Sequence, residues 1–135
     1  MQKKAGLVKG DRAIIFMPMV PEAMITMLAS WRIGVTFSAI FSSFESEPIH
    51  ERILHTGAKV VFTANAFTRG TKTFPLKERI DEAVVGTQIE KVVILNRDGS
   101  QPKMMEGRDI GWSDFLEGAS TEVPAVPLES NFPSY

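Results

Sequence analysis

The feature that most constrains this chain is the alternation of short apolar runs with longer segments of helical spacing. Largely apolar runs cover residues 12–17, 35–41, 59–64 and 91–95. A continuous apolar run of this length is typical of a strand that is covered on both faces. Strands that alternate with amphipathic helices indicate a parallel sheet flanked by helices. We therefore predict an α/β fold, with an open, mostly parallel sheet in a three-layer αβα arrangement.

The first helix is marked at both ends by residues suited to those positions. Pro21 fits a first helical position, Glu22 complements the helix dipole there, and Gly34 ends the pattern. Residues with helical spacing follow Glu22, namely Met24, Met27, Leu28 and Trp31. We expect most of the seven methionines to fill the core and the tryptophans to anchor packing.

Two further helices are expected before the last apolar run. Residues 42–46 offer serine caps for a helix that continues to Thr56 and ends at Gly57. Its inward residues are predicted to be Ile49, Ile53 and Leu54. The next helix begins at Pro75 and is closed by Gly86. Its inward residues are predicted to be Leu76, Ile80, Ala83 and Val84.

The C-terminal part changes character. Residues 96–111 read as a polar loop and residues 112–118 as a short helix. Beyond residue 118, Pro124, Pro127 and Pro133 exclude a regular helix or a central strand. The predicted organisation is an α/β unit over residues 1–118, followed by an extended proline-rich tail over residues 119–135.

Composition excludes several classes of partner and site. The 135 residues have a net charge of -1, so no overall basic character favours nucleic acid or a membrane surface. No stretch of about twenty apolar residues occurs, so no membrane span is expected. The chain has no cysteine, which excludes thiolate metal sites and cysteine nucleophiles within it. We expect a cytoplasmic protein.

Sequence motifs for common active sites are missing. The turn after the first run contains two prolines and no glycine, which argues against a dinucleotide-binding turn. His50 and His55 are five residues apart and do not share a helix face, so we predict no metal site. The carboxylates Glu45, Glu47 and the pair Asp81-Glu82 read as solvated helix faces. We predict no catalytic residue in this chain.

A basic loop, Arg69-Gly70-Thr71-Lys72, follows the third apolar run. Ligands of open α/β sheets gather outside the carboxyl ends of the strands, and Arg and Lys bind phosphate there. Ser42-Ser43 follows the second run, and we expect the ends of the second and third strands to be neighbours. Spacing alone still favours an ordinary exposed loop over an anion site.

The sequence resembles acetyl-CoA synthetases and their short-chain acyl-CoA synthetase relatives, which are AMP-forming enzymes of the adenylate-forming superfamily. The resemblance covers nearly the whole chain in order. It lies in residues 8–22, 27–29, 32–34, 41–44, 52–53, 57–61, 63–64, 69–72, 75–77, 90–93, 108–110 and Trp112.

The resemblance implies a two-step ligase reaction. A short carboxylate attacks ATP, with magnesium, to give an acyl-adenylate, and the CoA thiol then displaces AMP. It further implies that Arg69, Gly70, Thr71 and Lys72 contact CoA. Family members usually have Gly-Gly where this chain has Ser42-Ser43, so those two serines are candidate CoA neighbours in an altered setting.

The family's loop that cradles phosphate normally follows a segment like residues 128–135 and is not found in this sequence. The resemblance therefore implies a piece of the N-terminal domain, with ATP and magnesium ligands in the remainder of the polypeptide. Alone, the chain is expected to be inactive. Three alternatives remain open: another adenylate-forming acyl-CoA synthetase, a non-catalytic module that binds CoA or a nucleotide, and a structural piece that binds nothing until the rest of its sheet is present.

Overall fold

A computed structural model describes residues 1–135 and contains a five-stranded parallel sheet. The strand order is β2-β1-β3-β6-β7, and every neighbouring pair is parallel. The strands are β1 (Arg12–Phe16), β2 (Thr36–Ala39), β3 (Val60–Ala64), β6 (Lys91–Leu95) and β7 (Asp109–Gly111). A separate antiparallel pair consists of β4 (Phe67–Arg69) and β5 (Lys72–Phe74). The predicted open parallel sheet is confirmed.

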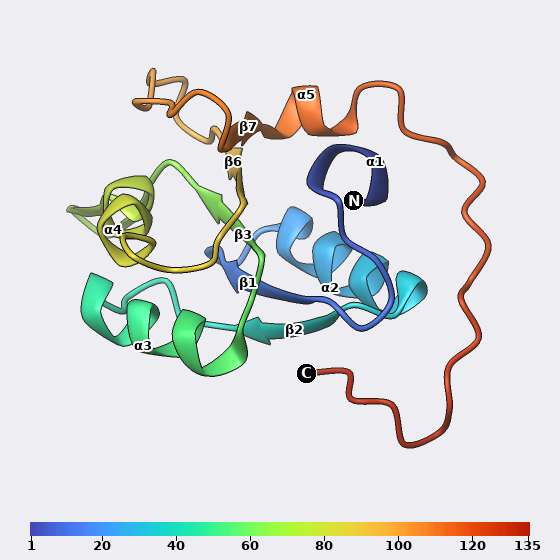
Figure 1. Cartoon of the computed structure of the whole chain (residues 1–135). Coiled ribbons are helices and arrows are strands. Elements are labelled where there is room, and N and C mark those ends of the chain that lie inside the picture. The colour runs from blue at the N-terminus through green and yellow to red at the C-terminus, as the bar shows by residue number, and fades with distance from the viewer.

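Helices cover both faces of the sheet, which gives the three predicted layers (Figure 1). The helices are α1 (Gln2–Ala5), α2 (Pro21–Ile33), α3 (Ser46–Thr56), α4 (Leu76–Ala83) and α5 (Trp112–Leu116). One face packs on α3 and α4, and the other packs on α1, α2 and α5. None of the five helices is both long and apolar enough to span a membrane.

Strand β1 shows why the sheet needs both layers. Ile14 and Phe16 belong to the core on the α3–α4 side, whereas Ala13 and Ile15 belong to the core on the other side. Successive side chains of a strand point to opposite faces, so an unbroken apolar run can be buried only when both faces are covered. The continuous runs in the sequence are explained by this arrangement.

Strand β7 was not predicted, because residues 96–111 read as a polar loop. Asp109 pairs with Val92 and Gly111 with Ile94, which adds a fifth parallel strand at the edge of the sheet. A three-residue strand is too short to show a periodic pattern. The strand therefore becomes visible only through its pairing with β6.

The helical spacing of apolar residues in α2 does not mark its buried face. Met24, Leu28 and Trp31 are exposed, whereas Thr26 and Ser30 are fully buried. The buried hydroxyls remain hydrogen-bonded, since Thr26 Oγ1 donates to Glu22 O at 2.7 Å and Ser30 Oγ donates to Thr26 O at 2.8 Å. Apolar residues occur on more than one side of this helix, so their spacing identifies the helix without fixing its orientation.

The methionine prediction is wrong. Met17 is buried, but Met19, Met24, Met104 and Met105 are exposed and the remaining two are only half-buried. Both tryptophans pack on core residues: the Trp31 ring lies 5.5 Å from that of Phe37, although Trp31 is 42% exposed, and the Trp112 ring lies 5.9 Å from that of Phe115.

Helix α3 corrects two details of the prediction. It begins at Ser46, and its N-cap residue is Glu45 without a side-chain capping hydrogen bond, so the expected serine caps are not used. Ile49 and Ile53 are fully buried, but Leu54 is 50% exposed. Positions four apart share a helix face, whereas Leu54 is rotated about 100° from Ile53.

Residues 119–135 contain no helix or strand. They run from α5 past α1 and α2 to the C-terminus near β2 (Figure 1). The Val126 N–H donates to Arg32 O at 2.9 Å, and Ser134 O accepts from Trp31 Nε1 at 3.2 Å. The tail therefore lies against the end of α2 through its own backbone groups.

The orientation of α3 predicts that replacing Ile53 or its neighbour Leu54 with alanine lowers the free energy of unfolding by different amounts. We expect Ile53→Ala to lower the free energy of unfolding by about 2–5 kcal/mol, because it leaves a cavity in the core. We expect Leu54→Ala to cost less than about 1 kcal/mol, because that side chain is largely solvated. Urea unfolding followed by circular dichroism measures both. Equal losses would contradict the orientation of α3.

Candidate anion-binding site

The candidate site lies at the carboxyl edge of the sheet, where all parallel strands end together. The segments that leave this edge include residues 17–20 after β1, residues 40–45 after β2, residues 65–75 after β3 and residues 96–108 after β6. The chain winds one way from β1 to β2 and then crosses back to β3. In open sheets, such a reversal of winding is where ligands commonly bind.

The basic loop is the turn of a β-hairpin. Strands β4 and β5 pair antiparallel, with Arg69 directly opposite Lys72. Gly70 occupies the turn with φ +63°, a conformation that favours glycine. Arg69, Gly70, Thr71 and Lys72 are all exposed. The hairpin thus presents its two cations side by side at an exposed tip, which we call the cationic tip (residues 69–72).

The stem of the hairpin is anchored by aromatic stacking. The rings of Phe67 and Phe74 stack with centroids 4.6 Å apart and an interplanar angle of 11°, and both pack against the core on the α3–α4 side. Lys72 Nζ lies 4.9 Å from the centroid of Phe74, within range of a cation–π interaction. An anchored stem and an exposed tip together suit the binding of an anion from solvent.

Ser42 and Ser43 are less directly connected to the cationic tip than the sequence suggested. Strand β1 lies between β2 and β3, so the ends of the second and third strands are not neighbours as expected. Neither serine makes a hydrogen bond to the hairpin; Ser42 is half-buried and Ser43 is exposed.

Arg79 of α4 connects the loop of residues 41–45 to the hairpin. It donates from Nη1 to Phe44 O at 2.9 Å and from Nη2 to Glu45 Oε1 at 2.7 Å. Its guanidinium also lies 5.5 Å from the ring centroid of Phe74. Sequence reasoning missed this residue, because its partner Glu45 lies far away in sequence and looked solvated.

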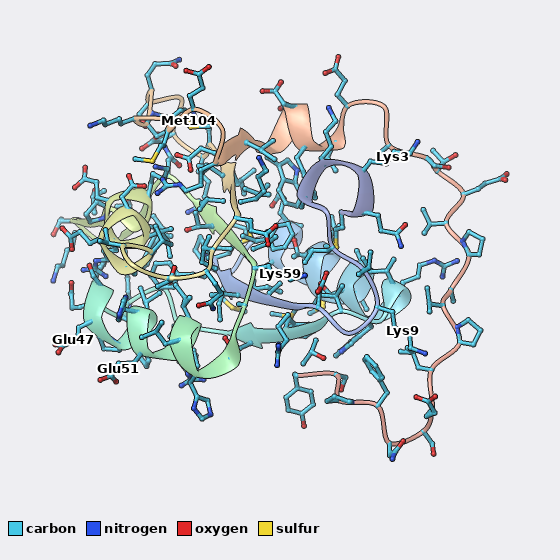
Figure 2. All side chains as sticks on the ribbon, in the orientation of Figure 1. Lys3, Lys9, Glu47, Glu51, Lys59 and Met104 are labelled. Atoms are coloured by element: carbon cyan, nitrogen blue, oxygen red, sulfur yellow. The ribbon has the colours of Figure 1, made fainter.

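A cluster of charged side chains fixes the start of α4 to β7. Lys77 is only 3% exposed, and its Nζ lies 2.7 Å from Asp81 Oδ1 and 2.9 Å from Asp109 Oδ2. Arg108 Nε lies 2.6 Å from Asp109 Oδ1, and its guanidinium also pairs with Asp81. Asp81 is thus not the solvated carboxylate that was expected, whereas Glu47 and Glu51 are exposed on α3 (Figure 2).

The environment of Asp109 favours its ionised form. Burial of this side chain raises its pKa, but hydrogen bonds from Arg108, the Met105 N–H and Lys77 outweigh that effect. The net result is a pKa below the usual value for aspartate. Asp109 therefore remains charged when it holds β7 against α4.

The residues with metal-ligating side chains do not converge. No group of three or more His, Asp or Glu side chains is placed to hold a metal ion. His50 Nδ1 lies 2.8 Å from Ala83 O, where it joins α3 to α4.

Layered α/β domains commonly bind small ligands at the carboxyl edge of the sheet, which is where this chain has its cationic tip. A protein-family model described as AMP-binding enzyme matches residues 1–131, and the chain belongs to this family.

Curated relatives are similar over almost all of this chain. Acetyl-coenzyme A synthetase of Syntrophus aciditrophicus is 40% identical over 136 residues, which cover 100% of the chain and 21% of that protein. The proteins of the same name from Rubrobacter xylanophilus and Salmonella typhimurium are 43% and 42% identical, over 95% and 96% of the chain and 20% of each protein. The chain thus spans about one fifth of the length of these relatives.

A solved structure supports the fold. Acetoacetyl-CoA synthetase from Streptomyces lividans superimposes with a TM-score of 0.80 and 20% sequence identity, over 93% of this chain and 19% of that one.

The buried cluster predicts a pH-dependent contribution of Asp109 to stability. Because its folded-state pKa is lowered, its contribution is complete above the unfolded value of about 3.9 and is lost as pH falls through the folded value. We expect Asp109→Asn to be less stable than the parent chain near neutral pH, and this gap to shrink below about pH 4. Urea unfolding over a pH series measures the gap.

The matched control is Glu51→Gln, which removes an exposed carboxylate from α3 (Figure 2). Its effect on stability should be small at every pH. A gap for Asp109→Asn that is constant down to about pH 2 would contradict the inferred role of the carboxylate.

Proposed function

We propose that this chain is the CoA-binding part of the N-terminal domain of an AMP-forming acetyl-CoA synthetase-like ligase. The observation that carries the proposal is identity of about 40% over nearly the whole chain to proteins named acetyl-coenzyme A synthetase. In the proposed reaction, a short carboxylate and ATP form an acyl-adenylate with release of pyrophosphate. The CoA thiol then attacks the acyl carbon, and AMP leaves.

The cationic tip is proposed to bind a phosphate group of CoA. The Arg69 guanidinium offers a planar fork of donors, and the Lys72 ammonium offers a mobile point charge. Gly70 has no atom within 4 Å of the position where a Cβ would stand, so ligand atoms can approach its backbone. Thr71 completes the turn, and Ser42-Ser43 are proposed to border the bound nucleotide from the loop after β2, which Arg79 connects to the hairpin.

The other functions of the enzyme are assigned to the remainder of the polypeptide. That part is proposed to supply the acyl pocket and the ligands of ATP and magnesium. We place the activity in the cytoplasm, with short carboxylate, ATP and CoA as small-molecule partners. Acetate is the proposed acyl substrate, because the curated relatives described above are all named acetyl-coenzyme A synthetase.

Binding of CoA by the 135-residue chain tests the role of the tip. We expect Arg69→Ala and Lys72→Ala each to weaken CoA binding by at least about tenfold, because a hydrogen bond to a charged group contributes about 1.5–3 kcal/mol. The affinity of the parent chain should also fall as salt rises. Isothermal titration calorimetry measures both effects.

Lys3→Ala provides the matched control, because Lys3 is an exposed cation on α1, on the other face of the sheet from α4 (Figure 2). It should leave the affinity unchanged. CoA binding that is insensitive to Arg69→Ala would overturn the assigned role of the tip.

We also expect the chain alone to form no acyl-CoA from acetate, ATP, magnesium and CoA. Its sequence has no glycine-rich loop that could hold the phosphates of ATP. A coupled assay for AMP and an assay for pyrophosphate exchange into ATP check the two half-reactions separately. Turnover in either assay would show that the chain contains catalytic groups that the proposal assigns elsewhere.

A further inference from the structure

We infer that Asn65 is a positioning residue that holds the cationic hairpin in place, so that its side-chain amide sets the affinity of the tip for CoA. The choice of ligand rests on the proposed function. Asn65 directly follows β3 and is separated from β4 by Ala66 alone. It is 5% exposed, in contrast to the exposed tip that it precedes.

The side chain of Asn65 makes hydrogen bonds through both Oδ1 and Nδ2 to the segment that follows β6. Oδ1 accepts from the Arg97 N–H at 2.9 Å. Nδ2 donates to Ser100 Oγ at 2.8 Å and to Asn96 Oδ1 at 3.2 Å, and it also contacts the Asp98 carboxylate. One amide thus joins the end of β3 to the loop of residues 96–100.

The backbone of Asn65 closes the base of the hairpin. Its N–H donates to Leu95 O at 2.9 Å, and its carbonyl accepts from the Lys77 N–H at 3.1 Å. Lys77 comes three residues after the end of β5, so both ends of the hairpin meet at Asn65. The charged cluster around Lys77 fixes the far side of this junction to β7.

The position of the tip depends on this base, because the tip itself is exposed and open. Beyond Gly70 and its two neighbours in the chain, no residue comes within 4 Å of the place where a Gly70 side chain would begin, and residues 68–73 are exposed. A binding group that is held in place before the ligand arrives loses less conformational entropy on binding. Loss of the amide contacts should therefore weaken CoA binding even though Asn65 does not touch the ligand.

Asp98 makes the contact sensitive to charge. Hydrogen bonds from Ser100, and then from Asn65, lower the pKa of Asp98, so its carboxylate is ionised beside the amide. Asn65→Asp preserves shape but places a second carboxylate against Asp98. The double variant Asn65→Asp/Asp98→Asn again places one amide beside one carboxylate, with the two groups exchanged. Comparison of the single with the double variant therefore distinguishes loss of this one contact from a general loss of packing.

The experiment compares the parent chain with Asn65→Ala, Asn65→Asp and the double variant Asn65→Asp/Asp98→Asn. NMR heteronuclear relaxation of the Gly70 and Thr71 amides measures the order of the tip without CoA, and calorimetry measures CoA affinity. We expect both single variants to show a more mobile tip and an affinity weakened by about fivefold to tenfold. The double variant should recover both properties.

Asn131→Asp is the matched control, because it adds the same charge at an exposed tail position. A merely structural role for Asn65 would lower the melting temperature while tip order and affinity stay as in the parent chain. That outcome, or a double variant that does not recover, would overturn this inference. CoA binding that ignores Arg69→Ala would instead overturn the proposed function of the tip, and the tip-order measurement would still decide whether Asn65 positions the hairpin.

Discussion

The burial of β3 along its whole length is the constraint on which the rest of the structure depends. All five residues of this strand are buried, with β1 and β6 on its two sides and helices over both faces. Unpaired polar groups would be costly along such a strand, and its one polar side chain, Thr63, donates from Oγ1 to Phe16 O at 2.9 Å. Unpaired polar side chains can therefore lie only beyond the ends of β3. Since the five strands of the sheet are parallel, their carboxyl ends lie at one edge, and the hairpin leaves the sheet at that edge.

The sequence predicts this frame well because the frame depends on local patterns. Continuous apolar runs define the four main strands, and a proline followed thirteen residues later by glycine bounds α2. The features that the sequence did not predict depend on contacts between residues far apart in the chain. In α2, Leu28 is exposed and Thr26 is buried, because this helix has apolar residues on more than one side and only packing selects the side that faces the sheet. Strands of three residues, such as β7, exist only through pairing.

The candidate site was predictable in residue type but not in geometry. Arg69 and Lys72 could be singled out as a candidate anion-binding pair, whereas the hairpin that sets them opposite each other could not be predicted. Arg79 and Asn65 escaped notice for a physical reason: their partners lie between 31 and 35 residues away in sequence. No helical or strand periodicity links positions so far apart.

Lys77 and Lys72 lie in the same region but differ in their surroundings: one is in buried ion pairs, and the other is exposed without an ion pair. Lys77 is buried and neutralised by Asp81 and Asp109, so its charge is committed to holding α4 against β7. Lys72 is exposed and lies over an aromatic ring, and neither it nor Arg69 forms an ion pair. Because the net charge of the chain is -1, any attraction for an anion must be local. At the tip, two cations without ion pairs lie opposite each other across one hairpin, and the contacts of Asn65 connect its base to the sheet without neutralising either charge.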